Sequence, residues 1–303
     1  MKKKYLNECI DSTFVSSVGK YVDSFEKEFA KTVGSKFAIA TVNGTAALHV
    51  SLLLADVKKD DEVITQPLTF IATCNAISYI GAKPIFVDVD LDTMGLSPDS
   101  LRNFLERNCE VVENICINKT TNRQIKACVP MHTFGHPCRI DEIKDICDIW
   151  NITLVEDAAE SLGATYKGKH TGTFGDFGIY SFNGNKILTT SGGGMLVSSN
   201  KEWIEKAKFY STQAKEPYIH YEHLEYGYNY RMSNVLAAIG VGQMEVIEDR
   251  VAKKREIFEW YKEFLGNIKE ISFMPELENS RGNRWLTAIT FEKSDYNKIM
   301  KVL

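Results

Sequence analysis

The sequence has little proline or glycine and no long hydrophobic run. Of its 303 residues only 7 are Pro and 20 are Gly, which excludes collagen-like and low-complexity chains. A membrane-spanning helix needs about 18 uninterrupted apolar residues, and no run of this length is present. The basic start, MKKKYLNECIDS, is not followed by the apolar segment of a signal peptide. With 44% apolar and 25% charged residues, the chain is expected to fold as a globular protein that has no membrane partner.

The sequence also lacks an excess of positive charge and any C-x-x-C pair. Its 36 Lys and Arg against 40 Asp and Glu give a net charge of −4. Such a balance supplies no field for a polyphosphate backbone, so nucleic acid is not expected as a partner. The seven cysteines are an odd number, which predicts free thiols and a protein of the reducing cytoplasm.

Short β-branched runs alternate with stretches of helical periodicity over most of the chain. This alternation predicts an α/β fold with a mostly parallel seven-stranded sheet and flanking helices. The expected strands are residues 37–42, 62–65, 83–89, 125–131, 152–157, 177–182 and 194–199. The expected crossover helices are residues 45–54, 70–80, 140–150 and 201–210.

The pattern changes after Asn234. Residues 235–265 read as one long helix with a charged and an apolar face, and strand-like alternation returns after it. We therefore expect a large domain over residues 1–245 and the start of a smaller C-terminal domain, incomplete in this chain, over residues 246–303.

Ligands of open α/β sheets bind at the carboxyl ends of the strands, where this sequence carries polar residues. Asn43-Gly44-Thr45 joins a strand to a helix, and its free N–H groups and hydroxyl suit a phosphate, although an ordinary helix N-cap is the more common reason for such a motif taken alone. Glu156 and Asp157 end a strand, so alternation should send them to opposite faces, and one must point inward. An inward carboxylate needs a partner. No metal-ligand cluster surrounds it in the sequence, and a heterocyclic N–H⁺ would serve.

Lys186 follows the strand FGIYSF in apolar, Gly-rich surroundings. Such a site can turn an amine into a nucleophile for carbonyl compounds, whereas a lysine taken at random is far more often a surface residue. Its combination with Asp157, an intervening hydroxyl residue and an earlier phosphate-binding helix start matches the needs of pyridoxal phosphate. The sequence therefore predicts this cofactor.

Two competing glycine motifs do not fit. Residues 163–169 match G-x-x-x-x-G-K, but His170 stands where a P-loop has its Mg²⁺-binding Ser or Thr, and no helical sequence follows. Residues 172–178 do not match G-x-G-x-x-G, which removes the dinucleotide interpretation.

The chain resembles the fold type I, pyridoxal-phosphate-dependent nucleotide-sugar aminotransferases. The resemblance runs through NGTAALHVSLLLADVKKDDEVITQPLTFIATCNAI, VPMHTFGHPCRIDEI, VEDAAESLGATYKGKHTGTFGDFGIYSFNGNKI, SGGGMLV and EYGYNYRMSNVLAAIGVGQME. Within the family it is most similar to enzymes that aminate C4 of 4-keto-6-deoxy sugars in the N-acetylbacillosamine and legionaminic acid pathways. The perosamine synthases are a close second.

The resemblance implies a role for each matching residue. It implies that Lys186 binds the cofactor covalently and that Asp157 pairs with its ring nitrogen. Thr45, Ala46 and Ser181 are implied to contact the phosphate, and Phe70 is implied to lie on the ring. Glu160 is implied to lie near the ring oxygen, at a position where much of the family has Gln or His. The resemblance also implies a homodimer in which Asn229 reaches the cofactor of the neighbouring subunit. The implied substrate contacts are His132, with His136, and Arg231.

The resemblance implies a transaminase that takes an amino group from glutamate and places it on a nucleotide-linked keto sugar. UDP and GDP both remain open as the carrier, as does the substituent at C2. A sugar dehydratase of the same fold would have histidine in place of Lys186. A truncated, non-catalytic homologue is the alternative from another class, because a fold does not fix a function.

Overall fold

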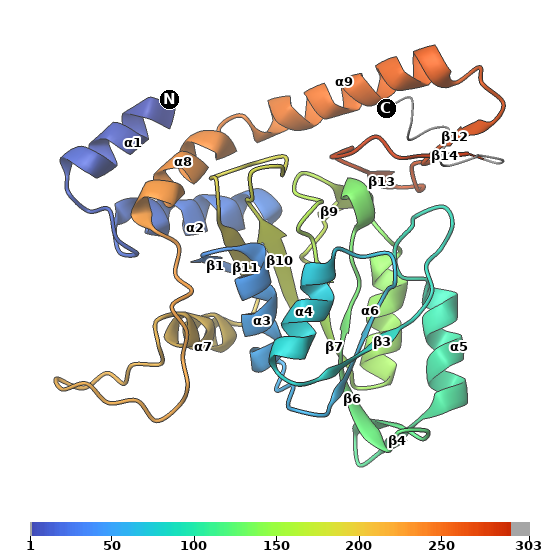
Figure 1. Cartoon of the computed structure of the whole chain (residues 1–303), viewed down its shortest axis with the longest axis horizontal. Helices are drawn as coiled ribbons and strands as arrows, with labels where there is room; N and C mark the ends of the chain where they lie inside the picture. Colours follow the sequence, from blue (N-terminus) through green and yellow to red (C-terminus); the bar gives the residue numbers. More distant parts are fainter. Residues whose placement is uncertain (1, 292–303) are drawn as a thin grey trace, which may run out of the picture.

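The computed structural model describes residues 2–291, and a central nine-stranded sheet organises them (Figure 1). Seven strands follow the order β1-β11-β10-β7-β6-β2-β3. Strands β10, β7, β6, β2 and β3 are parallel, whereas β11 runs antiparallel to both β1 and β10. These strands are β1 (Phe37–Thr41), β2 (Glu62–Thr65), β3 (Lys83–Phe86), β6 (Arg123–Val129), β7 (Thr153–Asp157), β10 (Phe177–Ser181) and β11 (Gly194–Ser198). All seven predicted strands are confirmed, and so is the α/β class.

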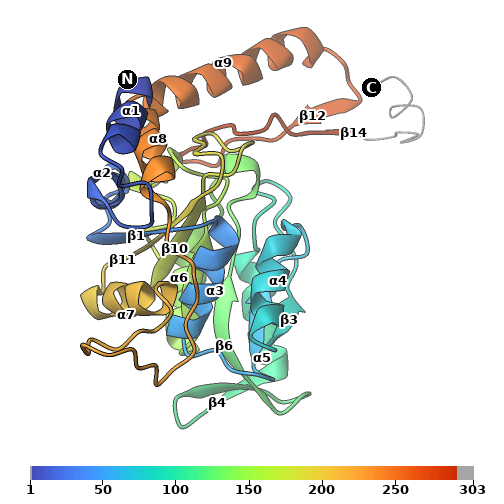
Figure 2. The same cartoon turned by 60° about the vertical axis from the view of Figure 1, so that its left-hand side comes forward.

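Helices cover both faces of the sheet because side chains alternate along each strand. On β11, Leu196 packs in a core with α3 (Gly44–Leu54), α4 (Ile71–Tyr79) and α7 (Lys201–Ser211). Met195 and Val197 face the other way, toward α2 (Lys20–Val33) and α8 (Asn234–Met244). Figure 2 shows α3 and α4 next to each other, and the two helices are in contact. The remaining helices are α1 (Lys2–Asp11) against α8, and α5 (Pro98–Asn108) and α6 (Ile140–Ile149) over a third core cluster.

Several short elements were not predicted. A hairpin of β4 (Cys109–Val112) and β5 (Ile115–Asn118) extends the sheet beside β6. The single turn η1 (Thr133–Gly135) follows β6. Two small sheets lie apart from the central one, and they consist of β8 (Thr165–Tyr166), β9 (Lys169–His170) and β13 (Ser280–Arg281), and of β12 (Ile271–Phe273) and β14 (Ile289–Phe291).

The single long helix predicted over residues 235–265 is wrong. The chain forms two helices, α8 and α9 (Ile247–Leu265), and Val246 between them has non-helical backbone angles of φ −126° and ψ 17°. The two helices have different partners: α8 is apolar and packs on α1 and α2, whereas α9 exposes its charged face and runs above β12 and β14 (Figure 2). The break falls at the predicted domain boundary. The domain division itself stays a prediction, and residues 292–303 lie outside the described part.

Candidate active site

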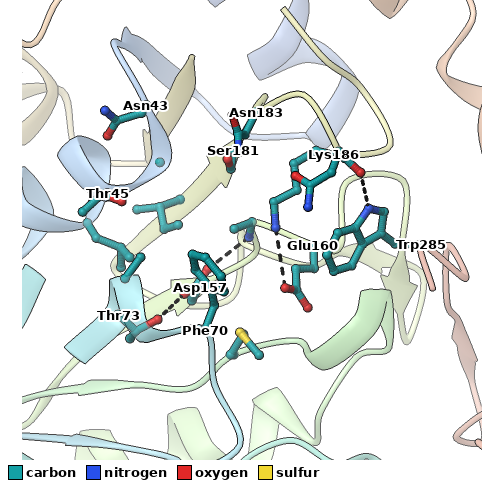
Figure 3. Close-up of a pocket in the computed structure, with 17 residues that line it drawn as sticks. Asn43, Thr45, Phe70, Thr73, Asp157, Glu160, Ser181, Asn183, Lys186 and Trp285 are labelled. Carbon is teal, nitrogen blue, oxygen red and sulfur yellow. Dashed lines mark hydrogen bonds and ion pairs between the residues drawn. The ribbon is translucent and has the colours of Figure 1, made fainter. Parts of the chain in front are cut away.

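A pocket of about 310 Å³ lies over the carboxyl ends of β7 and β10 (Figure 3). Strand β7 contributes Asp157, β10 contributes Ser181, and the loop after β10 contributes Lys186. The helices α3 and α4 present their N-terminal ends, with Thr45 and Phe70. Six of the residues expected to bind the cofactor thus line one cavity: Thr45, Phe70, Asp157, Glu160, Ser181 and Lys186.

Asp157 is buried, and each of its carboxylate oxygens accepts a hydrogen bond. Oδ2 accepts from the Thr73 hydroxyl at 2.7 Å, and Oδ1 accepts from the Ala159 N–H at 3.1 Å. Burial raises the pKa of Asp157, while these two bonds and the charge of Lys186 act in the opposite direction. The carboxylate is therefore oriented and held at the pocket wall, where a cationic N–H would restore the balance of charge.

Glu156 is also buried, so both acids at the end of β7 point inward and not just one. It lies on the other face of the sheet, where its oxygens accept hydrogen bonds from the backbone N–H groups of Gly172, Phe174 and Gly175. His132 Nε2 lies 3.0 Å from Glu156 Oε2. His132 is fully buried in this network and does not line the pocket, and its expected substrate contact stays a prediction.

The amine of Lys186 has two neighbours in the pocket. Its Nζ lies 3.5 Å from Glu160 Oε1 and 4.2 Å from the centre of the Trp285 ring (Figure 3). Burial raises the pKa of Glu160, opposed by the charge of Lys186 and by the N–H of Phe134, which Glu160 Oε2 accepts at 2.8 Å. The contact of Trp285 with Lys186 was not predicted, because nothing in the sequence around Trp285 links it to a lysine so far away in the chain.

The start of α3 is an ordinary helix N-cap, and its binding of a phosphate stays a prediction. Asn43 is an N-cap residue whose Oδ1 accepts the N–H of Ala46 at 2.7 Å. Ala46 is buried in this cap and does not line the pocket, and its expected phosphate contact stays a prediction. A Cβ on Gly44 would lie 2.9 Å from Ser181 Cβ, so glycine allows α3 to begin directly against β10.

Three other expected residues lie outside this pocket. Arg231 is buried, pairs with Glu26 at 2.6 Å and donates to the Ala40 carbonyl, and its expected substrate contact stays a prediction. His136 is buried against Arg284. Asn229 is exposed in an isolated bridge to Thr212. Its expected contact is with the cofactor of a second subunit, and this stays a prediction.

The side chains that meet in the pocket fit pyridoxal phosphate. Lys186 supplies an amine for its aldehyde, Asp157 a carboxylate for its ring N–H⁺, and Phe70, whose side chain is 65% exposed, an aromatic face. Thr45 and Ser181 supply hydroxyl groups beside a helix N-terminus, which suits a phosphate. Residues 2–291 contain no group of three or more His, Cys, Asp or Glu that could hold a metal ion. In the same range, no helix is both long and apolar enough to span a membrane. The fold and the pocket define the class of pyridoxal-phosphate-dependent transferases.

Comparison with known proteins narrows this class. The chain belongs to the DegT/DnrJ/EryC1/StrS aminotransferase family, whose profile matches residues 1–303. It is 45% identical over 303 residues to the EpsN protein of Bacillus subtilis, whose name provisionally describes a pyridoxal-phosphate-dependent aminotransferase; the match covers 99% of this chain and 76% of EpsN. It is 40% identical to the GDP-perosamine synthase of Escherichia coli O157:H7, over 89% of this chain and 70% of that enzyme.

Solved structures support the fold. The aminotransferase from Psychrobacter cryohalolentis is 31% identical, with a TM-score of 0.80 over 94% of this chain and 73% of that one. The resemblance seen in the sequence is thereby confirmed at the level of the family, its fold type I architecture, its cofactor and its sugar aminotransferase activity. These comparisons do not distinguish the N-acetylbacillosamine and legionaminic acid subgroup from other sugar aminotransferases.

Proposed function

We propose that the protein transfers the amino group of glutamate to C4 of a nucleotide-linked 4-keto-6-deoxy sugar, with a 2-acetamido sugar as the first candidate. The observation that carries this proposal is the meeting of Lys186 and Asp157 in one buried pocket between the starts of α3 and α4. An amine nucleophile and a charged ring partner are the two groups that transamination requires from the protein.

Each residue of the pocket then has a task. The cofactor supplies an electron sink for the carbon that loses its proton. Lys186 would hold the aldehyde group of the cofactor through its amine, and the same amine would carry a proton to and from the reacting carbon of the sugar. Asp157 keeps the ring nitrogen protonated, and Thr73 fixes the direction of its carboxylate. Phe70, which lines the pocket, would offer its aromatic face to the ring of the bound cofactor.

The test uses the visible absorbance of the purified protein loaded with pyridoxal phosphate. Adding glutamate alone should remove the visible band, and adding the keto sugar should restore it and yield an amino sugar of the expected mass. A band that no amino acid removes would overturn transamination and favour a protein that binds the cofactor without turnover. A sugar dehydratase would release a deoxygenated product instead.

GDP is the second candidate for the carrier, because GDP-perosamine synthases are 36–40% identical to this chain. Two keto sugars separate the candidates: a UDP-linked 2-acetamido-4-keto-6-deoxy sugar and a GDP-linked 4-keto-6-deoxy sugar. The carrier with the higher kcat/KM identifies the substrate. Equal values would show that the enzyme does not discriminate between these two substrates.

We further propose that the enzyme works in the cytoplasm as a homodimer. All seven cysteines are buried free thiols, which supports a reducing compartment. Cell fractionation and the molecular mass in solution test the two parts of this proposal separately.

A further inference from the structure

We propose that Trp285 is a positioning residue for Lys186, and that residues 282–286, here named the strap, set the geometry of the reactive amine from outside the central sheet. The inference rests on the proposed function, since it concerns the same lysine. Four observations carry it: the hydrogen bonds that anchor the strap, the contacts of the Trp285 ring, the backbone of Arg284 and the burial of all three residues 283–285.

The strap is anchored on the residues that surround Glu160. Asn283 is fully buried, and its Nδ2 donates to the carbonyl oxygens of Glu160 at 2.8 Å and Leu162 at 2.9 Å. The N–H of Asn283 donates to the Gly135 carbonyl, and that of Leu286 to the Phe134 carbonyl. Phe134 in turn donates its own N–H to Glu160. The strap thus holds, through the main chain, the carboxylate that faces Lys186.

Trp285 contacts Lys186, which forms the ion pair with Glu160. Its indole N–H donates to the carbonyl of Asn185 at 2.8 Å, which fixes the main chain directly before Lys186 (Figure 3). The face of the same ring lies 4.2 Å from Lys186 Nζ. A cation over the face of an indole is attracted by the ring quadrupole, most strongly where water is excluded, and Trp285 is only 6% exposed. One side chain therefore restrains both the backbone and the amine of Lys186.

The strap adopts a backbone conformation that its own residues do not favour. Arg284 has a φ of +52°, in the left-handed region, although it is not glycine. Strained residues of this kind persist where the surroundings over-determine them, and they cluster at functional sites. The surroundings here are specific: the Arg284 guanidinium donates to the Met274 carbonyl at 2.8 Å and lies 3.8 Å over the Phe258 ring. Asn283 Oδ1 accepts the N–H of Trp285 and completes the turn.

The experiment uses the 303-residue chain loaded with pyridoxal phosphate and two substitutions. Trp285→Leu removes the aromatic face and the N–H, whereas Trp285→Phe keeps a face and removes only the N–H. The visible band is titrated with pH, because a cation held over an aromatic face stays protonated to higher pH. We expect the midpoint of the band to fall by about one pH unit in Trp285→Leu and to stay near wild type in Trp285→Phe.

Steady-state kinetics gives a second readout. A misplaced reactive group costs on the order of 100-fold in rate, so kcat should fall about 100-fold in Trp285→Leu and about 10-fold in Trp285→Phe. KM for glutamate should change less than about threefold, because the ring acts on the lysine and not on glutamate binding. If Trp285→Leu does not fold, Trp285→Phe carries the test, and an unchanged kcat would then overturn the role of the indole N–H.

Trp260→Leu is the matched control. Trp260 lies on α9, is 46% exposed, and has Lys253 Nζ 4.5 Å over its ring, so it is a tryptophan–lysine pair away from the pocket. It should leave the band and kcat unchanged. A wild-type protein that never acquires the band would overturn the proposed function. A normal wild-type band with the same pH midpoint in Trp285→Leu would overturn only the role of Trp285.

Discussion

Glu156 and Asp157 are adjacent in the chain, and both are buried on opposite faces of β7 with separate sets of hydrogen-bond donors. Glu156 accepts from three backbone N–H groups and lies beside His132, so its charge is balanced within the protein. Asp157 has one hydroxyl and one N–H donor and faces the pocket. Glu156 therefore holds the loop after β9 on the sheet, whereas the carboxylate of Asp157 is available to a ligand in the pocket.

Amide substitutions at these two positions should have different effects. Glu156→Gln places an NH₂ group among N–H donors and should lower the free energy of unfolding by about 3 kcal/mol. Asp157→Asn removes a buried charge without changing its shape, so stability should change little while kcat falls about 100-fold. Urea unfolding and steady-state kinetics measure both. If Asp157→Asn keeps near-normal turnover, Asp157 does not pair with the ring nitrogen.

Lys186→Ala should abolish the visible absorbance and the turnover while the protein stays folded. The lysine lies in a loop and not in the core, and Glu160, whose pKa burial already raises, can take up a proton when the ammonium is removed. The control is Lys201→Ala, which truncates an exposed lysine at the start of α7 and should keep the band. Full activity of Lys186→Ala would refute the mechanism.

The sequence predicted the sheet better than the pocket. The seven strands are β-branched runs bounded by turn residues, so local patterns were sufficient to place them. The hairpin 109–118 was missed because β4 is mostly exposed and carries Glu110, without the regular alternation of a half-buried strand. In the pocket, Asp157 ends β7 and Lys186 follows β10, and the topology of parallel strands brings such residues together.

The contacts that the sequence did not predict join residues that are distant in the chain. Arg231 looked available for a substrate, but it is buried against Glu26, 205 residues away. His132 looked like a loop residue but is buried beside Glu156. Trp285 reaches Asn185 across 100 residues. Burial and ion pairing of this kind depend on tertiary packing, which no local periodicity encodes.

The stability of the protein should decrease in acid because of His136. This imidazole is buried, and burial together with the charge of Arg284 lowers the pKa of His136 to about 3; Arg255 lowers it further, and Glu276 opposes. In the unfolded chain a histidine titrates near pH 6.5. The stabilisation is therefore complete above pH 6.5 and is lost as the pH falls toward 3, by up to about 1.4 kcal/mol per pH unit.

His136→Gln should remove this slope, since a glutamine oxygen can still accept from Arg284 but does not titrate. Urea unfolding of both proteins at pH 7, 6 and 5 measures the difference. His220→Gln, which truncates an exposed imidazole, controls for the substitution. Parallel slopes for wild type and His136→Gln would show that His136 is protonated in the folded protein.

Asn229 should complete the active site of a second subunit. In its own chain it is exposed, forms a bridge to Thr212 and does not line the pocket. The segment around it carries Tyr228 and Tyr230, which stack at 4.9 Å, and leads directly into α8. Aromatic residues beside polar donors are typical of interfaces between subunits. A twofold dimer would present each Asn229 to the pocket of its partner.

Mixing two inactive variants tests this arrangement. Lys186→Ala lacks the reactive amine, and Asn229→Ala lacks the proposed phosphate donor. If sites are shared, a heterodimer contains one site with both substitutions and one site with neither, so subunit exchange at equal concentrations should restore about a quarter of wild-type activity, because half of the dimers then carry one intact site of two. Each variant incubated alone under the same conditions is the control. Exchange that is demonstrated by labelled subunits but restores no activity would place Asn229 in the site of its own chain or outside the site.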